Sequence, residues 1–298
     1  MTLPAPPPDF DGYWRSVDVD LTRYPGRPEL TFDSLRSSDI SRVYRLRITS
    51  VGPYRIFGYF SVPAGEGPFP ALLLTPRYGS VNHVPDYNDR ARCVCLQIMH
   101  RGQRLADQPF AARYPGLLTH GIDDAETYIY RAIVADCLRA AEFIFDRPEV
   151  DRTRMAIVGD DLALITAARR PGFATLQAAG LVFYRLIEAC SRTSAYPIEE
   201  VNDFIRARPE ATDDVERTVS YFDPRHHAAA IDSRVTLSVG DQGALGGPEW
   251  LAPLFESLGE HAYAYTLTHE GGTDHDRLDA LLAERMGVPA MSRFRREL

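Results

Sequence analysis

Short apolar runs alternate along the chain with longer stretches whose apolar residues recur at helical spacing. Val43–Ile48 alternates apolar and polar residues, and Tyr54–Val62 follows after a Gly-Pro turn, which predicts an antiparallel hairpin. Continuous apolar runs predict buried strands at Ala71–Thr75, Cys93–Met99, Met155–Val158, Leu181–Tyr184, Val235–Val239 and Tyr263–Thr268. Helical spacing predicts helices at Tyr128–Phe145, Leu162–Ala168, Ile198–Ala207, Pro248–Ser257 and Asp276–Met286.

Strands that alternate with helices predict an α/β fold: a mostly parallel, eight-stranded sheet covered by helices on both faces. The opening hairpin adds antiparallel strands at one edge, and this order suits an α/β-hydrolase sheet. No internal repeat or long linker divides the chain, so we expect a single domain over residues 1–298, with residues 1–40 as an N-terminal extension packing on the core. In such sheets the chemistry lies on loops at the carboxyl ends of the strands.

Composition excludes several classes of function. The 298 residues carry 33 basic and 41 acidic side chains, and a formal net charge of −8 disfavours nucleic acid as a partner. No apolar run approaches the roughly 20 residues that span a bilayer, so no membrane association is expected. The first eleven residues are rich in proline and lack a cationic start, which argues against a signal peptide and for a cytoplasmic protein.

The residue inventory also limits cofactors. The chain contains no lysine, which excludes Schiff-base, pyridoxal-phosphate and P-loop chemistry. The four cysteines form no CxxC pair and predict buried free thiols. The neighbouring His226 and His227, and His275, lack metal-ligand spacing. We therefore expect neither a cofactor nor a metal.

The segment from Met155 to Leu164 reads as strand, tight turn and helix. This is the layout of a nucleophile elbow, in which small residues stand two positions on either side of the nucleophile. Gly159 and Ala163 satisfy that requirement, but the central residue is Asp161 instead of serine. The pattern therefore predicts a retained turn with altered chemistry.

Five motifs in the same order make the chain resemble the acetyl xylan esterase / cephalosporin C deacetylase family of α/β-hydrolases (carbohydrate esterase family 7). The resemblance runs nearly end to end. The motifs are Pro8–Trp14, Arg101–Gln103, Tyr114–Ile122 with Tyr128, Tyr130 and Arg131, Ser220–Asp223, and His269–Gly272.

The resemblance implies a serine esterase with a Ser-His-Asp triad, and it gives each triad member a position here. The family serine falls on Asp161, the histidine on His269 and the acid on Gly243, so only the histidine is retained. The oxyanion-hole donors would be the backbone N–H groups of Tyr78 and Leu162. Family members assemble into oligomers, which implies a homo-oligomer.

An aspartate in the serine position changes what the site can do. A carboxylate is competent for displacement at an sp³ carbon, giving an ester that a histidine-activated water then hydrolyses. That scheme uses Asp161 and His269, with Asp241 or Glu188 as candidate acids behind the histidine. Arg77 and Arg101 are candidate groups for binding an anionic substrate. Structural arginines are the alternative.

Each candidate also has a structural interpretation. Asp161 is equally consistent with a helix-capping carboxylate. His269 is consistent with a turn residue, and Asp241 with a solvated loop residue. Three hypotheses follow: a non-standard hydrolase acting through Asp161 and His269 on a small substrate, a catalytically silent binding or assembly subunit, and a lyase or isomerase with either residue as general base.

Overall fold

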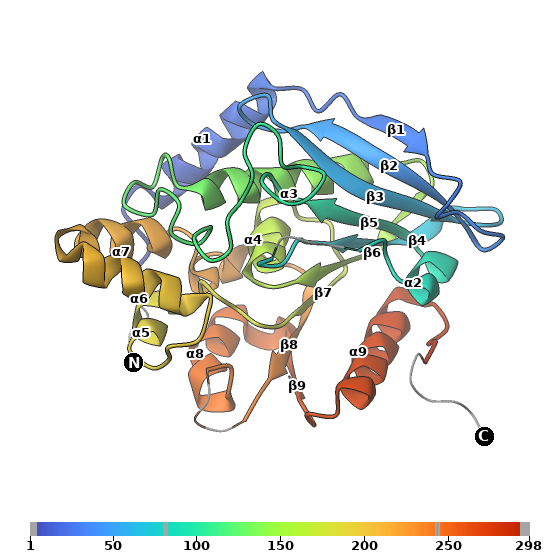
Figure 1. The fold of residues 1–298 in the computed structure, drawn as a ribbon. Helices are drawn as coiled ribbons and strands as arrows, with labels where there is room; N and C mark the ends of the chain where they lie inside the picture. The colour runs from blue at the N-terminus through green and yellow to red at the C-terminus, as the bar shows by residue number, and fades with distance from the viewer. Residues whose placement is uncertain (1–4, 80–82, 242, 244, 293–298) are drawn as a thin grey trace.

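The computed structural model describes residues 5–79, 83–241, 243 and 245–292. One sheet runs through the molecule in the order β1-β2-β3-β5-β4-β6-β7-β8-β9 (Figure 1). The strands are β1 (Glu29–Phe32), β2 (Ser41–Thr49), β3 (Arg55–Pro63), β4 (Phe69–Leu74), β5 (Val94–Met99), β6 (Val150–Gly159), β7 (Thr175–Ala178), β8 (Arg234–Val239) and β9 (Ala262–Thr266). The first three strands and β5 pair antiparallel, whereas all pairs from β5 to β9 are parallel.

Alternation along the central strands explains why helices cover both faces. In β4, Leu73 packs into the core that α3 shares, while its neighbour Leu72 packs on the side of α9, because successive strand side chains point to opposite faces. The helices are α1 (Phe10–Arg23), α2 (Tyr87–Arg92), α3 (Ile129–Phe145), α4 (Asp161–Arg169), α5 (Leu186–Cys190), α6 (Ile198–Ala207), α7 (Thr212–Ser220), α8 (Pro248–Leu258) and α9 (Gly271–Met286). The predicted mostly parallel sheet with helices on both faces is confirmed.

Two strand predictions need correction. The sheet has nine strands instead of eight, because Glu29–Phe32 adds an exposed edge strand without a clear apolar signal. The predicted strand at Leu181–Tyr184 is a loop, and β7 is the preceding Thr175–Ala178. The apolar side chains of Phe183 and Tyr184 are buried as expected, but the backbone N–H groups of Val182 and Tyr184 bond to a side chain instead of a strand.

The N-terminal residues pack onto the core through α1. The Tyr13 hydroxyl donates to the Ala125 carbonyl at 2.9 Å, and its ring stacks on Tyr221 at 4.1 Å between centroids. Arg131, from the start of α3, pairs with Asp20 at 3.2 Å. These contacts join motifs that lie more than 100 residues apart in the chain into one packed region.

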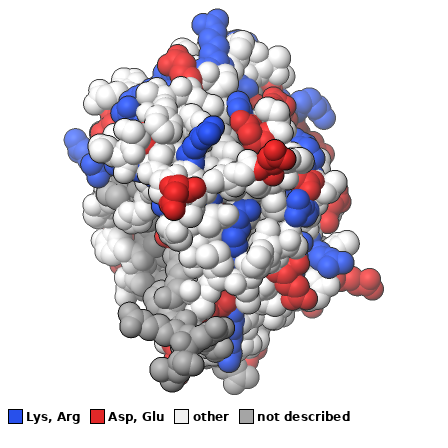
Figure 2. Space-filling model, turned by 90° about the vertical axis from the view of Figure 1, so that its right-hand side faces the viewer, with Lys and Arg blue, Asp and Glu red and all other residues white. Residues whose placement is uncertain are grey.

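Charges on the surface are mixed. On the face shown in Figure 2, arginines and acidic side chains alternate, and the described residues of that face form no extended basic patch. Within the described residues, no helix is long and apolar enough to cross a bilayer.

Candidate functional site

The turn between β6 and α4 is shaped by close packing at Gly159. A Cβ atom at this position would lie 1.8 Å from the Thr75 hydroxyl oxygen and 3.3 Å from the Ala163 Cβ. Only glycine fits at such an approach. The predicted arrangement of strand, tight turn and helix with small flanking residues is therefore confirmed.

Asp161 is the first residue of α4 and only 1% of its surface is exposed. Its Oδ2 atom accepts the Val182 N–H at 2.5 Å and its Oδ1 atom accepts the Tyr184 N–H at 3.1 Å. Burial raises the pKa of Asp161, as does the neighbouring charge of Asp160, and the backbone N–H groups oppose them. The carboxylate joins the start of α4 to the loop after β7.

The backbone at Asp161 is also relaxed. The positive-φ residues other than glycine in the described chain are Arg27, Leu105, Arg185 and His269. A nucleophile elbow holds its nucleophile on a strained turn so that the side chain is exposed. Here the apex of the turn is Asp160, and Asp161 continues into a regular helix with its side chain turned into the protein.

Asp160 caps α4 and accepts a hydrogen bond from the Leu162 N–H, which is one of the two predicted oxyanion donors. Its Oδ1 atom accepts the Leu162 N–H at 2.9 Å, as N-cap aspartates do. Burial raises the pKa of Asp160, while the charge of Arg77 lowers it. Because the Leu162 N–H is engaged by this carboxylate, it is not free to stabilise an oxyanion on a substrate.

The loop that carries Tyr78 is held from both sides. The Tyr78 hydroxyl donates to the buried Glu200, which also accepts the Leu118 N–H at 3.1 Å. The Gln103 amide donates to the carbonyls of Arg77 at 3.0 Å and Gly79 at 2.7 Å. The Tyr78 backbone N–H remains the predicted second oxyanion donor, and Arg77 stays exposed beside it.

Arg101 has a structural partner instead of an open anion-binding position. Its guanidinium and backbone N–H bond to the fully buried Asp136, with an ion-pair distance of 2.8 Å, and it also donates to the Val51 carbonyl at 3.1 Å. The family-like Arg101–Gln103 motif thus anchors one loop and orients another. The geometry does not support the predicted substrate-binding role of Arg101.

His269 and Asp241 meet at the surface. The His269 Nε2 atom lies 3.0 Å from Asp241 Oδ1, and the two side chains are 56% and 76% exposed. The predicted pairing of these residues is therefore present in the structure. His269 itself adopts φ 62°, in the left-handed region. No hydrogen bond joins it to Asp161, whose two oxygens accept backbone N–H groups elsewhere.

Glu188 and Gly243 do not supply an acid behind the histidine. Glu188 lies on α5 and forms an ion pair with Arg185, which lowers the pKa of this carboxyl. It follows the Leu181–Tyr184 run, which is a loop instead of the predicted strand. Gly243 has φ +78°, so an aspartate there would be strained.

Sequence reasoning missed the partners that decide these roles. Asp160 stands directly before a helix, which is an N-cap signal that the sequence contains. The contacts of Glu200 and of the 182–184 backbone could not be predicted from a local sequence pattern, because tertiary packing brings both to the site. Among the described residues, no group of three histidine, cysteine or acidic side chains is placed to hold a metal ion.

The chain is similar to acetyl xylan esterases in sequence and in structure. An acetyl esterase, Axe7A, of Xylanibacter ruminicola is 23% identical over 252 residues, which are 78% of this chain and 56% of that protein. The chain thus spans little more than half of that relative. Acetyl xylan esterase from Paenibacillus sp. R4 superposes with a TM-score of 0.84 at 22% identity, covering 97% of both chains. Acetyl xylan esterase 1 from Thermoanaerobacterium sp. JW/SL YS485 gives 0.79 at 22% identity, covering 95% of both.

These structures share the α/β-hydrolase fold, and the predicted fold class is confirmed. The family model of acetyl xylan esterase (AXE1) matches residues 2–278, which is nearly the whole chain. The resemblance expected from the five motifs is thereby confirmed, and this chain belongs to the acetyl xylan esterase (AXE1) family.

Proposed function

We propose that this chain is a non-hydrolysing member of its family, which keeps the hydrolase scaffold as a small-molecule-binding subunit. The observation that carries the proposal is the state of Asp161. Both of its carboxylate oxygens accept backbone N–H groups, and 1% of the residue is exposed. A nucleophile must direct a free lone pair at the substrate. The buried, hydrogen-bonded Asp161 carboxylate cannot reach a substrate in this arrangement.

The neighbouring groups support the same proposal. Stabilising the oxyanion is usually the largest single contribution to acyl transfer, and the Leu162 N–H that would contribute to it is bonded to Asp160. In a serine triad the acid bonds Nδ1 of the histidine, and Nε2 takes the proton of the nucleophile. Here Asp241 occupies Nε2 of His269. The three groups that an esterase needs are each engaged in another contact.

A second candidate is a hydrolase that uses Asp161 as nucleophile at an sp³ carbon. One observation favours it: Asp241 pairs with His269 through Nε2, which leaves Nδ1 as the ring nitrogen that could activate a water. The scheme requires the 182–184 loop to release Asp161 before attack. In the first step a carboxylate oxygen would form a C–O bond while the leaving group departs with the electron pair of its bond.

One experiment separates the two. Purified protein is incubated with acetyl esters, alkyl halides and epoxides, and the intact mass and the product are measured. The non-hydrolysing proposal expects no adduct, and acetyl-ester turnover at least ~10³-fold below that of a serine-bearing relative. An adduct that maps to Asp161 supports the second candidate, and brisk deacetylation that His269→Ala abolishes overturns the first.

The remaining expectations stay predictions. Small-molecule partners, a homo-oligomer and a cytoplasmic location are consistent with the family and with the proposal. Size-exclusion chromatography with light scattering tests the oligomer. A lyase or isomerase role for Asp161 meets the same obstacle as the nucleophile role, because a general base must reach its proton.

A further inference from the structure

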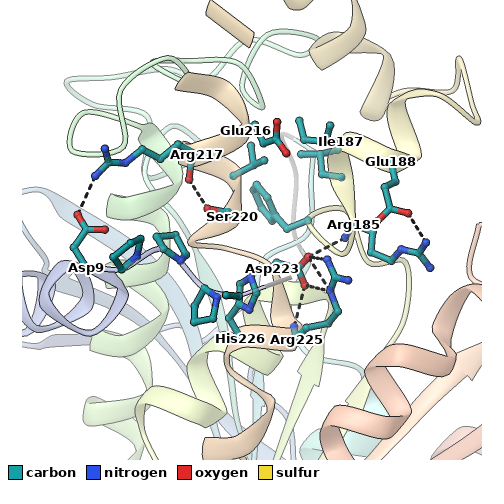
Figure 3. A pocket seen from close by; sticks show the side chains of 17 residues that line it. Asp9, Arg185, Ile187, Glu188, Glu216, Arg217, Ser220, Asp223, Arg225 and His226 are labelled. Atoms are coloured by element: carbon teal, nitrogen blue, oxygen red, sulfur yellow. Dashed lines mark hydrogen bonds and ion pairs between the residues drawn. The ribbon is translucent and has the colours of Figure 1, made fainter. Parts of the chain in front are cut away.

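A cavity of about 590 Å³ opens between the N-terminal segment, α5 and α7, away from the Asp241–His269 pair (Figure 3). Its walls are largely apolar and include Pro6, Pro7, Pro8, Phe183, Ile187 and Val219. The volume is in the range of small-molecule sites, which are typically concave, apolar and provided with a few polar groups. It also lies in the segment that follows β7, a parallel strand whose carboxyl end is where such folds bind ligands.

Each arginine around this cavity is paired with a carboxylate. Arg225 pairs with Asp223 at 2.6 Å, Arg217 pairs with Asp9 at 3.0 Å, and Arg185 forms an ion pair with Glu188 (Figure 3). Each arginine of the wall has a carboxylate of the same wall as its partner, and Glu216 adds one further negative charge. An anionic ligand would therefore have to displace a carboxylate from its arginine.

His226 is a polar side chain of the wall that suits a neutral ligand. Its ring contacts Phe10 edge-on at 6.0 Å between centroids, and among the described residues it makes no side-chain hydrogen bond. Burial lowers the pKa of His226, so the ring is neutral at neutral pH. A neutral imidazole presents one N–H donor and one nitrogen acceptor, which suits a hydroxyl or carbonyl group.

The wall of the cavity is positioned by Asp161. Phe183 lines the cavity, and its two neighbours Val182 and Tyr184 donate their N–H groups to the Asp161 carboxylate. The next residue, Arg185, has φ 52° and donates its backbone N–H to Asp223 at 3.2 Å. The family's nucleophile position thus fixes the loop that shapes this cavity.

We propose that this cavity binds a neutral small molecule, with an aromatic or aliphatic body against the apolar wall and a hydroxyl or carbonyl group hydrogen-bonded to His226. The inference deepens the proposed binding function and rests on it for the role of Asp161 as a positioning residue. Because every arginine of the wall is already paired with a carboxylate, we expect the neutral ligand to bind more tightly than its carboxylate analogue.

The test compares three probes with the same ring system: 1-naphthalenemethanol, 1-naphthoate and 1-naphthylmethylammonium. Binding to the full chain is measured by titration calorimetry or ligand-observed NMR. The alcohol is expected to bind at least about tenfold more tightly than the carboxylate, because a carboxylate that reached Arg225 would have to break its buried ion pair with Asp223. Equal or tighter binding of the carboxylate or of the ammonium overturns the proposal, as does no binding of the alcohol.

Variants locate the site. Ile187→Trp fills the cavity from the half-buried face of α5 and should abolish binding of the alcohol. His226→Phe should weaken binding about fivefold, which corresponds to the loss of one neutral hydrogen bond. His226→Gln should keep most of the affinity. His261→Gln, on an exposed residue outside the cavity, is the matched control. Unchanged binding in folded Ile187→Trp overturns the site.

A further variant separates this proposal from the proposed function. Asp161→Asn should weaken binding of the alcohol without creating turnover of acetyl esters, because the loop loses one of its two anchors. Ester turnover of the unaltered chain is measured in parallel. His269-dependent hydrolysis contradicts the proposed function alone, whereas loss of selectivity for the alcohol contradicts the cavity alone.

Discussion

The turn after β6 and the loops after β8 and β9 carry the residues predicted to form one catalytic triad. In this structure the turn is buried and the loop residues are exposed. Asp161 is buried with both oxygens accepting N–H groups, whereas the Asp241–His269 pair is more than half exposed. A triad works only when its members share one site and act as a unit. The comparison teaches that a family-like histidine motif can be present while the residue predicted at the nucleophile position makes its hydrogen bonds elsewhere.

The two regions also differ in what their polar contacts contribute to stability. A buried carboxylate that satisfies two N–H groups is costly to remove, because the donors are left without partners. An exposed ion pair contributes about 0–1 kcal/mol. Under the proposed function, Asp161 is therefore a structural anchor, while the His269 loop is a surface feature.

The largest expected effect is on acetyl-ester hydrolysis, and it tests whether Asp160 and Asp161 together prevent this reaction. Asp161→Ser alone should leave acetyl-ester hydrolysis near background, because Asp160 still occupies the Leu162 N–H. Asp160→Gly combined with Asp161→Ser frees that donor and should raise the rate about 10²-fold over the single variant, the usual worth of one oxyanion donor. The measurement is kcat on an aryl acetate. Equal rates in the two variants would contradict the idea.

A smaller effect concerns stability. Asp161→Ala leaves the Val182 and Tyr184 N–H groups without an acceptor and should lower the free energy of unfolding by about 2 kcal/mol. Asp161→Asn retains one acceptor oxygen and should lose less. Urea unfolding followed by circular dichroism measures both. A stability of the alanine variant equal to that of the unaltered chain would show that the loop is not anchored by this carboxylate.

The pH dependence of the free energy of unfolding tests the same region. The folded pKa of both Asp160 and Asp161 is raised above the usual 3.8, so their contribution to stability is present below about pH 4 and is lost as the pH rises through the raised values. Asp160→Asn keeps a capping oxygen for Leu162 but removes the charge that raises the pKa of Asp161. Between about pH 5 and pH 8, the unaltered chain should therefore lose more stability than Asp160→Asn. A steeper loss in the variant contradicts this prediction.

The smallest effect is expected at the exposed pair. His269→Ala and Asp241→Ala should each change the free energy of unfolding by less than about 0.5 kcal/mol, as surface substitutions do. The two variants also serve as controls for Asp161→Ala under the same conditions. A loss as large as that of Asp161→Ala would show that the His269 loop is also part of the packed structure.

Much of the fold and part of the site could be predicted from local patterns. The helix predicted at Ile198–Ala207 matches α6, and the strand predicted at Val235–Val239 matches β8 within one residue. The small residues around Asp161 indicated a tight turn, and Asp241 was one of two candidate partners of His269. The Leu181–Tyr184 run was misread because apolar content records burial, and buried loops and strands share it.

The amino-acid sequence by itself determined the family and the alternation of strands and helices, because both depend on residue types and their order. Tertiary structure decided the surroundings of Asp161. The direction of the Asp161 side chain depends on which backbone N–H groups lie within reach, and these come from a loop 21 to 23 positions further along the chain. Burial and long-range hydrogen bonds are properties of the packed chain, so the same aspartate that reads as a nucleophile in a motif becomes an anchor in the fold.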